Sequence, residues 1–119
     1  YDIIQSRLDF INLFFSKVGI SPLAENRDVL VAPPRIHADV GLFFKEAHRF
    51  EKRQPGCNRA FWESLQVDIL AVSLPAVNLS GTHDLTAQQR QLIHANLPEN
   101  SRVFELLIEN ELIFIIEKN

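Results

Sequence analysis

The spacing of apolar and polar positions changes along the chain, and each spacing predicts a different element. Near the N-terminus apolar residues recur every three or four positions, which predicts an α-helix that ends at Gly19. Its apolar face comprises Ile4, Leu8, Ile11, Phe15 and Val18, widened by Ile3, Phe10 and Phe14. A face this wide is typical of a helix that is buried by more than one neighbour.

At the other end of the chain, two apolar runs of strand length, 103–108 and 112–116, flank the polar trio 109–111. This pattern predicts a mostly buried β-hairpin with its turn at Asn110. We expect the first helix and the hairpin to form the core, and polar substitution at Phe15 or Phe104 to unfold the domain. The side chains predicted to be buried are Ile11, Phe15, Phe104, Ile108, Phe114 and Ile116.

The middle of the chain predicts a linker and a second helix. Residues 21–34 are interpreted as a linker with a short extended stretch, 29–32, that Pro33 and Pro34 stop. Residues 38–53 are interpreted as a helix that ends at the Pro-Gly pair. Its apolar stripe would be Val40, Phe43, Phe44, Ala47 and Phe50.

Residues 59–74 fit two interpretations. In one, Asn58 caps a short helix that is followed by a strand; in the other, a single helix continues through the segment. Further on, Thr86 and Gln89 have the spacing of a capping box, with Thr86 at the N-cap of a helix that Pro98 stops.

These elements predict an α+β fold, with three or four helices packed on a small, mostly antiparallel sheet that ends in the C-terminal hairpin. At 119 residues we expect one domain, and a chain that starts at Tyr1 and contains no Met is expected to be excised from a longer protein. The single cysteine excludes an internal disulfide and favours a cytoplasmic location, and no segment predicts a membrane span.

Charge is unevenly distributed. Residues 1–59 carry nine basic and seven acidic side chains, whereas residues 60–119 carry three and eight. One face of the predicted 38–53 helix is basic, so it is a candidate contact for an anionic partner such as nucleic acid. The residues of this candidate contact are Lys45, Arg49, Lys52 and Arg53, followed closely by Arg59.

Helices followed by a hairpin are also the elements of a winged helix, which would bind DNA. The hairpin, however, carries four carboxylates that would repel phosphate, so this interpretation ranks below phosphate binding by the basic helix face alone. These carboxylates belong to Glu105, Glu109, Glu111 and Glu117.

No catalytic or metal-binding pattern stands out. The four histidines lack the i, i+3 or i+4 spacing of a ligand pair. Cys57, close in sequence to several cations, could have a lowered pKa, although an incidental thiol is the preferred interpretation. The sequence therefore predicts no enzyme activity, no cofactor and no metal.

Residues 77–81 read Val-Asn-Leu-Ser-Gly and residues 104–110 read Phe-Glu-Leu-Leu-Ile-Glu-Asn, with Pro-Leu-Ala-Glu at 22–25 upstream. Strings in this order are similar to those of EAL domains, which bind or cleave cyclic di-GMP. The chain resembles that family in these strings, and the resemblance implies a metal-holding role for Asn78 and for Glu105 or Glu109. No Glu-Ala-Leu motif precedes Pro22, so the resemblance implies at most a degenerate, non-catalytic relative.

The leading functional prediction is a non-enzymatic protein–protein interaction or regulatory module of a larger protein. A protein partner or self-association is expected through Phe14, Phe15, Ile113 and Ile115. Nucleic-acid binding through the basic helix face and a degenerate cyclic-dinucleotide binder are the alternatives.

Overall fold

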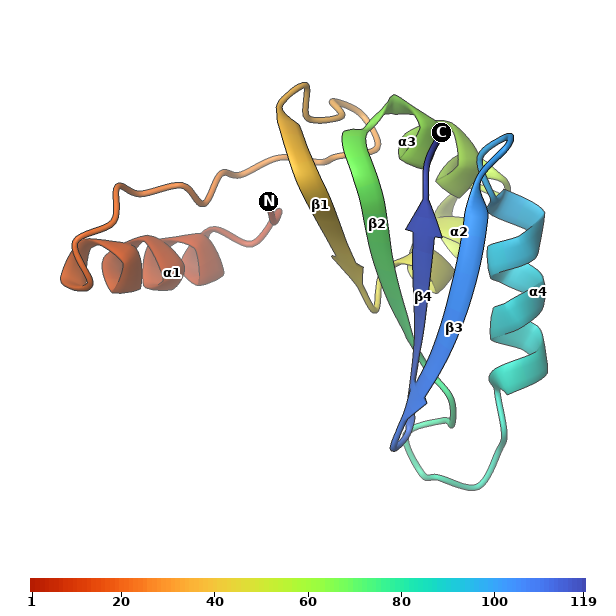
Figure 1. The fold of residues 1–119 in the computed structure, drawn as a ribbon. Coiled ribbons are helices and arrows are strands. Elements are labelled where there is room, and N and C mark those ends of the chain that lie inside the picture. Colours follow the sequence, from red (N-terminus) through yellow and green to blue (C-terminus); the bar gives the residue numbers. More distant parts are fainter. The chain divides into compact units, whose positions relative to one another are not determined.

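A computed structural model describes residues 1–119 (Figure 1). In chain order the elements are α1 (Gln5–Lys17), β1 (His37–Phe44), α2 (Ala47–Arg53), α3 (Cys57–Ser64), β2 (Gln66–Pro75), α4 (Thr86–Asn96), β3 (Arg102–Ile108) and β4 (Glu111–Glu117). The chain divides into two compact units, Tyr1–Pro34 and Arg35–Asn119. The single domain predicted from the sequence stays a prediction. No helix is long and apolar enough to cross a membrane.

The first unit contains α1 and the segment that follows it. The predicted helix and its end at Gly19 are confirmed, and Gly19 has the left-handed φ of 77° that a glycine adopts without strain. The expected burial is wrong: Leu8 is the buried residue of the helix, Ile11 is exposed and Phe15 is half-buried. The helix lacks a packed partner within its unit, where loop segments are its neighbours.

The segment after α1 is tied to the helix by hydrogen bonds. The Asn12 side chain donates to the carbonyl of Ala24 and accepts from its N–H, both at 2.9 Å. The predicted extended stretch 29–32 is wrong, because the Asp28 carbonyl accepts the N–H groups of Val31 and Ala32 and so closes a turn.

The second unit is built on a four-stranded sheet in the order β1-β2-β4-β3. Strands β1 and β2 are parallel, and the other two pairs are antiparallel. The crossover from β1 to β2 contains α2 and α3, and α4 connects β2 to the C-terminal hairpin. The predicted α+β class, the mostly antiparallel sheet and the hairpin are confirmed.

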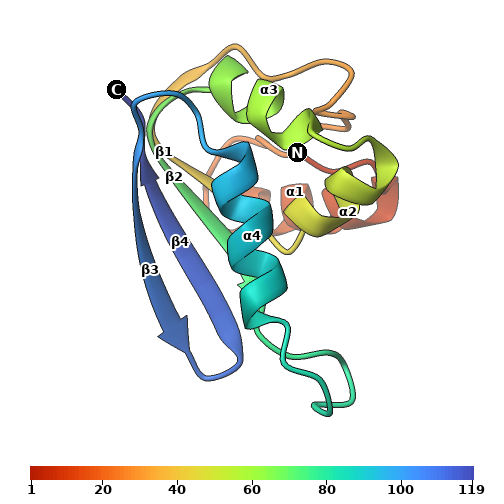
Figure 2. The same cartoon turned by 90° about the vertical axis from the view of Figure 1, so that its right-hand side faces the viewer.

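One face of this sheet, the covered face, carries the helices (Figure 2). Its central side chains are at most 1% exposed, and they come from alternate positions of β2 and β4. They are Leu70, Val72, Leu74, Leu112, Phe114 and Ile116. On β1, Phe43 packs edge-on against Phe61 and Trp62 of α3, with ring centroids 5.5 and 6.2 Å apart. These contacts form the core of the unit, and the predicted burial of Phe114 and Ile116 is confirmed.

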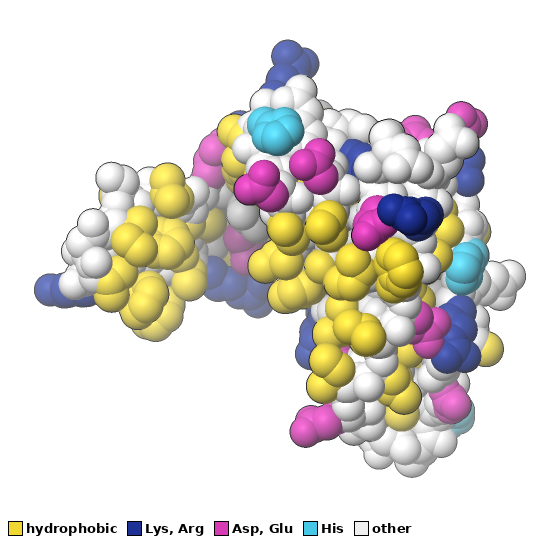
Figure 3. All heavy atoms as spheres, viewed as in Figure 1, with side chains coloured by type: hydrophobic (Ala, Val, Ile, Leu, Met, Phe, Trp, Pro, Cys, Tyr) yellow, Lys and Arg dark blue, Asp and Glu magenta, His cyan; other side chains and the backbone are white.

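The opposite face, the open face, is also apolar. The register pairs Phe104 with Ile115 and Leu106 with Ile113, so these side chains share one surface with alternate residues of β1. Figure 3 shows hydrophobic side chains gathered across the strands. The predicted burial of Phe104 and Ile108 is wrong, because they are 51% and 55% exposed. Both lie on the face without helices, so polar substitution at Phe104 is no longer expected to unfold the unit.

Part of the predicted second helix is a strand. Residues 37–44 pair with β2, and only Ala47–Arg53 is helical. Alternation explains the difference, because Phe43 lies on the covered face while Leu42 and Phe44 remain exposed. The chain has little room for a side chain at Gly41, since a Cβ there would lie 3.3 Å from Leu70 Cδ1.

The remaining segment, 59–74, is helix and then strand. Gly56, with φ of 78°, precedes α3, so the predicted cap Asn58 lies inside the helix, fully buried. The predicted capping box is also wrong: Thr86 is the first residue of α4, and its N–H donates to the Asp84 carboxylate at 2.8 Å.

Candidate functional site

The carboxyl ends of β1 and β2 lie at the same edge of the sheet because the two strands are parallel. In open α/β sheets, ligands bind outside the carboxyl ends of parallel strands, and the β1–β2 pair is the parallel part of this sheet. Lys45 follows β1 directly and has a left-handed φ of 58°, which is costly for a residue with a side chain. Its N–H donates to the Ser73 carbonyl at 2.8 Å, and its ammonium lies 3.3 Å from the Glu111 carboxylate.

The loop that follows β2, residues 76–85, is fastened to the same edge. The N–H of Ala76 donates to the carbonyl of Asn110 in the hairpin turn, and the Ala76 carbonyl accepts from Leu85 at 2.7 Å. An isolated antiparallel bridge between Val77 and Asp84 closes the base of the loop. The loop therefore leaves the sheet and returns to it as a defined structure.

Asn78 organises the interior of this loop. Its side-chain oxygen accepts the N–H groups of Thr82 and His83 at 2.9 and 3.1 Å, and its own N–H donates to the His83 carbonyl. The Thr82 hydroxyl lies 2.8 Å from the Ser80 hydroxyl and 2.9 Å from His83 Nδ1. The loop is thus held together by amide, hydroxyl and imidazole groups that bond to one another.

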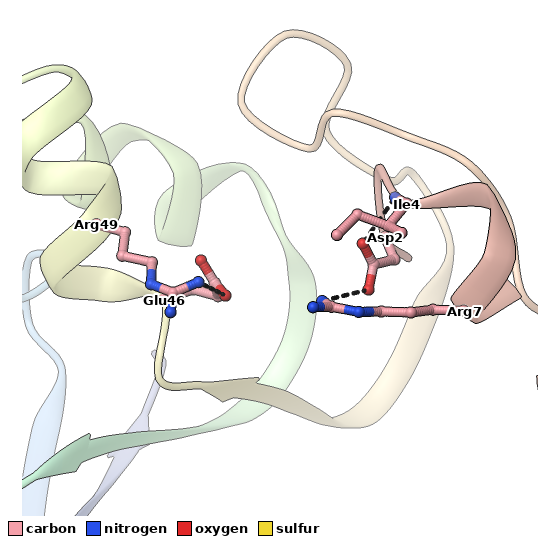
Figure 4. Close-up of polar contacts among 5 residues, drawn as sticks. All are labelled: Asp2, Ile4, Arg7, Glu46 and Arg49. Carbon is pink, nitrogen blue, oxygen red and sulfur yellow. Dashed lines mark hydrogen bonds and ion pairs between the residues drawn. The ribbon is translucent and has the colours of Figure 1, made fainter. Parts of the chain in front are cut away.

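The basic residues predicted to share one helix face lie on different elements of the structure. Lys45 belongs to the sheet edge, Arg49, Lys52 and Arg53 to α2, and Arg59 to α3. All five side chains are exposed. Arg49 lies 3.4 Å from the Glu46 carboxylate, as Figure 4 shows.

The predicted interface residues also belong to different elements, two in the first unit and two in the second. Phe14 is 55% exposed and Phe15 half-buried on α1, while Ile113 and Ile115 are half-buried on the open face of the second unit. Their role in contacting a partner stays a prediction.

The lowered pKa considered for the Cys57 thiol, the less preferred interpretation, is not supported. Cys57 is buried, and burial together with the nearby Glu51 carboxylate raises the pKa of the thiol. Its sulfur donates to the Phe50 carbonyl at 3.4 Å. No group of three or more His, Cys, Asp or Glu side chains is placed to hold a metal ion.

The first unit contains a partly exposed carboxylate that several groups hold in place, that of Asp2. Asp2 pairs in parallel with Asn26 through an isolated bridge and immediately precedes α1. Its carboxylate accepts the Ile4 N–H at 2.9 Å and lies 3.5 Å from Arg7 (Figure 4). The Ile4 N–H and then Arg7 lower the pKa of Asp2, so its carboxylate is ionised at neutral pH.

Sequence reasoning did not identify the 76–85 loop or Asp2 as site elements. It named Asn78 only through a family resemblance. The Asn-Leu-Ser-Gly turn preceding a helix was a usable signal for a structured loop. That this loop stands at the edge shared by two parallel strands required the topology.

Comparisons with known proteins point to one kind of protein. A 16S rRNA (guanine(1405)-N(7))-methyltransferase of Serratia marcescens is 34% identical over 95 residues, which are 78% of this chain and 38% of that protein. An rRNA methylase from Escherichia coli superposes with a TM-score of 0.82 at 29% identity, over 97% of this chain and 45% of that one. No protein-family model matches the chain.

A further solved structure supports the fold alone. The 16S rRNA methyltransferase RmtF, in complex with S-adenosyl-L-homocysteine, superposes with a TM-score of 0.85 at 21% identity, over 94% of this chain and 44% of that one. The chain therefore spans less than half the length of each of these proteins.

These similarities correct the functional predictions. The matched proteins are rRNA methyltransferases, so the predicted non-enzymatic interaction or regulatory module is wrong. The winged-helix and EAL-like alternatives are overturned by the same finding, and the hairpin is part of a four-stranded sheet rather than a separate wing. Over most of its length, the chain is similar to part of an rRNA methyltransferase.

Proposed function

We propose that the chain is part of an S-adenosylmethionine-dependent methyltransferase whose substrate is ribosomal RNA. The observation that carries the proposal is the 34% identity to the Serratia marcescens enzyme over 78% of the chain. The superposition on the Escherichia coli rRNA methylase supports it independently of that alignment. Such an enzyme would work in the cytoplasm, where ribosomes are assembled.

The reaction named for the relative has modest chemical requirements. Guanine N7 carries a lone pair and no hydrogen, so it attacks the methyl group without losing a proton. S-adenosylmethionine supplies an activated methyl group on a sulfonium, and the positive charge passes to the methylated base. The protein contributes position and orientation rather than a general base. This chemistry explains why the chain can be part of a methyltransferase although it has no cluster of side chains suited to general acid–base catalysis.

Asp2 is the residue we assign to the methyl donor. A partly exposed, ionised carboxylate that precedes a helix can accept hydrogen bonds from ribose hydroxyls. The Asp2 carboxylate is ionised and its side chain is 31% exposed, so it retains acceptor capacity beyond its bond to Ile4. These features fit the ribose of S-adenosylmethionine.

The exposed cations of α2 and α3 are the residues we assign to RNA phosphates. Arg49, Lys52 and Arg53 occupy one short helix, and Arg59 follows in the next. Glu51, the acidic residue among them, is directed inward, where its carboxylate accepts from Gly56, Asn58 and Asn96. The outer surface is consequently more basic than the sequence of α2 alone indicates.

The test is binding of S-adenosyl-L-homocysteine by calorimetry and of 16S rRNA by filter binding. Asp2→Asn should weaken S-adenosyl-L-homocysteine binding about tenfold, since it removes a charge-assisted hydrogen bond. Asp9→Asn, at an exposed helical carboxylate, is the matched control and should leave binding unchanged. A chain that binds neither ligand would contradict the proposal.

For RNA, the double variant Arg49→Glu, Lys52→Glu should weaken binding and reduce the slope of log affinity against log salt by about 1.5 to 2. Lys17→Glu, at an exposed lysine of α1, is the control. An unchanged slope would remove these residues from the RNA contact.

A further inference from the structure

Leu79 has the most exposed large apolar side chain in the protein. Its relative exposure is 111%, compared with 75% for Val31 and 70% for Leu23. An exposure above 100% means that the residue is more accessible to solvent than it is in an extended reference peptide. Leu79 therefore contributes nothing to the core, and its presence at a loop tip calls for an explanation outside folding.

The loop holds Leu79 in a fixed position. The N–H of Gly81 donates to the Asn78 carbonyl at 2.9 Å, which closes a β-turn with Leu79 at its second position and Gly81, φ 70°, at its fourth. The two hydrogen bonds to the Asn78 side-chain oxygen fasten the far side of the turn. A side chain presented by a rigid turn loses little conformational freedom when it binds.

The surroundings of Leu79 suit a nucleic acid. Residues 75–83 contain no Lys, Arg, Asp or Glu, so no carboxylate of this segment repels phosphate. The nearest carboxylate along the chain, Asp84, is occupied by the N–H of Thr86. The same loop carries the exposed hydroxyls of Ser80 and Thr82 and the imidazole of His83, groups of the kind that bond base edges.

The position of the loop links it to the reaction. It begins where β2 ends, at the edge of the sheet where open sheets bind ligands. Enzymes that modify a base take it out of the stack, and apolar side chains can enter a stack between bases.

We propose that Leu79 packs against the nucleobases beside the target guanine and fills the stack when the guanine leaves it. The proposal rests on the proposed function, because it takes ribosomal RNA as the substrate. The proposed partner of Leu79 is RNA whose bases can unstack.

The experiment uses an RNA duplex with the sequence around guanine 1405 of 16S rRNA, with 2-aminopurine beside that guanine. Wild-type protein should raise the 2-aminopurine fluorescence as it binds, because unstacking relieves quenching. Leu79→Ser should abolish this rise and weaken RNA binding about tenfold, because it removes the apolar contact with the bases. Leu79→Met, which keeps a long apolar side chain, should retain both properties.

Leu23→Ser is the matched control, because it makes the same change at another exposed leucine. It should behave as wild type, and unchanged thermal melting of both Ser variants would verify that they fold. If wild-type protein binds RNA and Leu79→Ser gives the same fluorescence rise and affinity, the role of Leu79 is overturned while the proposed function stands. If wild-type protein binds no RNA, both are overturned.

Discussion

The two faces of the four-stranded sheet have similar composition and different environments. On β4, Leu112, Phe114 and Ile116 are fully buried beneath helices, whereas the alternating Ile113 and Ile115 are half-buried on the open face. Every one of these side chains is apolar, so the residue types do not reveal which face the helices cover. Burial in this protein is decided by connectivity, because α2, α3 and α4 all lie on one side (Figure 2).

The residues that stabilise the unit are also distinct from those proposed to bind ligands. The covered face holds the unit together through aromatic and aliphatic contacts. The proposed chemistry lies elsewhere, on exposed loops and helix ends that depend on the sheet only for their position. Substitutions should therefore fall into two classes, those that alter melting and those that alter binding.

The largest effect should come from truncating a side chain on the covered face. Phe114→Ala removes a fully buried ring and should lower the free energy of unfolding by about 3–5 kcal/mol. Phe104→Ala, on the half-exposed open face, should cost only about 1 kcal/mol. Urea denaturation of the two variants measures the difference. Equal losses would mean that the open face is as well packed as the covered one.

A smaller effect is expected at the polar contact that joins the helices of the covered face. Asn58 is fully buried and donates to the Ala47 carbonyl at 2.9 Å and to Glu51 at 3.1 Å. Asn58→Ala removes both hydrogen bonds from a buried position and should cost about 1–3 kcal/mol in chemical denaturation. Asn100→Gly is the control and should cost much less stability. Asn100 is exposed and has a φ of 59°, a conformation that glycine favours. A loss at position 100 as large as that at position 58 would contradict this account of the helix junction.

The smallest effect is expected at the exposed rim, where Glu105 of β3 accepts a hydrogen bond from Arg90 of α4 at 2.5 Å. Hydrogen bonding to Arg90 lowers the pKa of Glu105 below its ordinary value of 4.5. The stabilisation is therefore complete above pH 4.5 and is lost as the pH falls through the lowered pKa. Glu105→Gln should reduce the acid sensitivity of thermal melting between pH 5 and pH 2, with little change at pH 7. If the melting temperatures of variant and wild type changed with pH in the same way, the assignment of this acid sensitivity to Glu105 would be contradicted.

Much of the fold follows from local patterns. The α1 helix, its end at Gly19 and the hairpin were predicted from spacing, because these signals lie within one element. The 37–44 strand was missed because Val40, Phe43, Phe44 and Ala47 also fit a helical stripe. Only the pairing with β2 decides between the two, and that pairing joins residues about thirty positions apart in sequence.

The site was harder to predict than the fold. A search for catalytic side chains finds groups that exchange protons or bind metals, and transfer to a nitrogen lone pair requires neither. The 76–85 loop has its proposed role because it leaves the sheet where β2 ends, which no local motif reports. The exposed cations were identified from sequence, although Lys45 was wrongly assigned to their helix.

The central claim is that this chain serves as the corresponding part of an rRNA methyltransferase. The most direct test replaces the matched segment of the Serratia marcescens enzyme with the 95 residues aligned here. Cleavage of 16S rRNA at N7-methylguanine, after borohydride and aniline treatment, then measures the activity of the chimera. The account predicts methylation of the same guanine. A chimera that folds and binds S-adenosyl-L-homocysteine and 30S subunits as the parent does, yet leaves that guanine unmethylated, would contradict it.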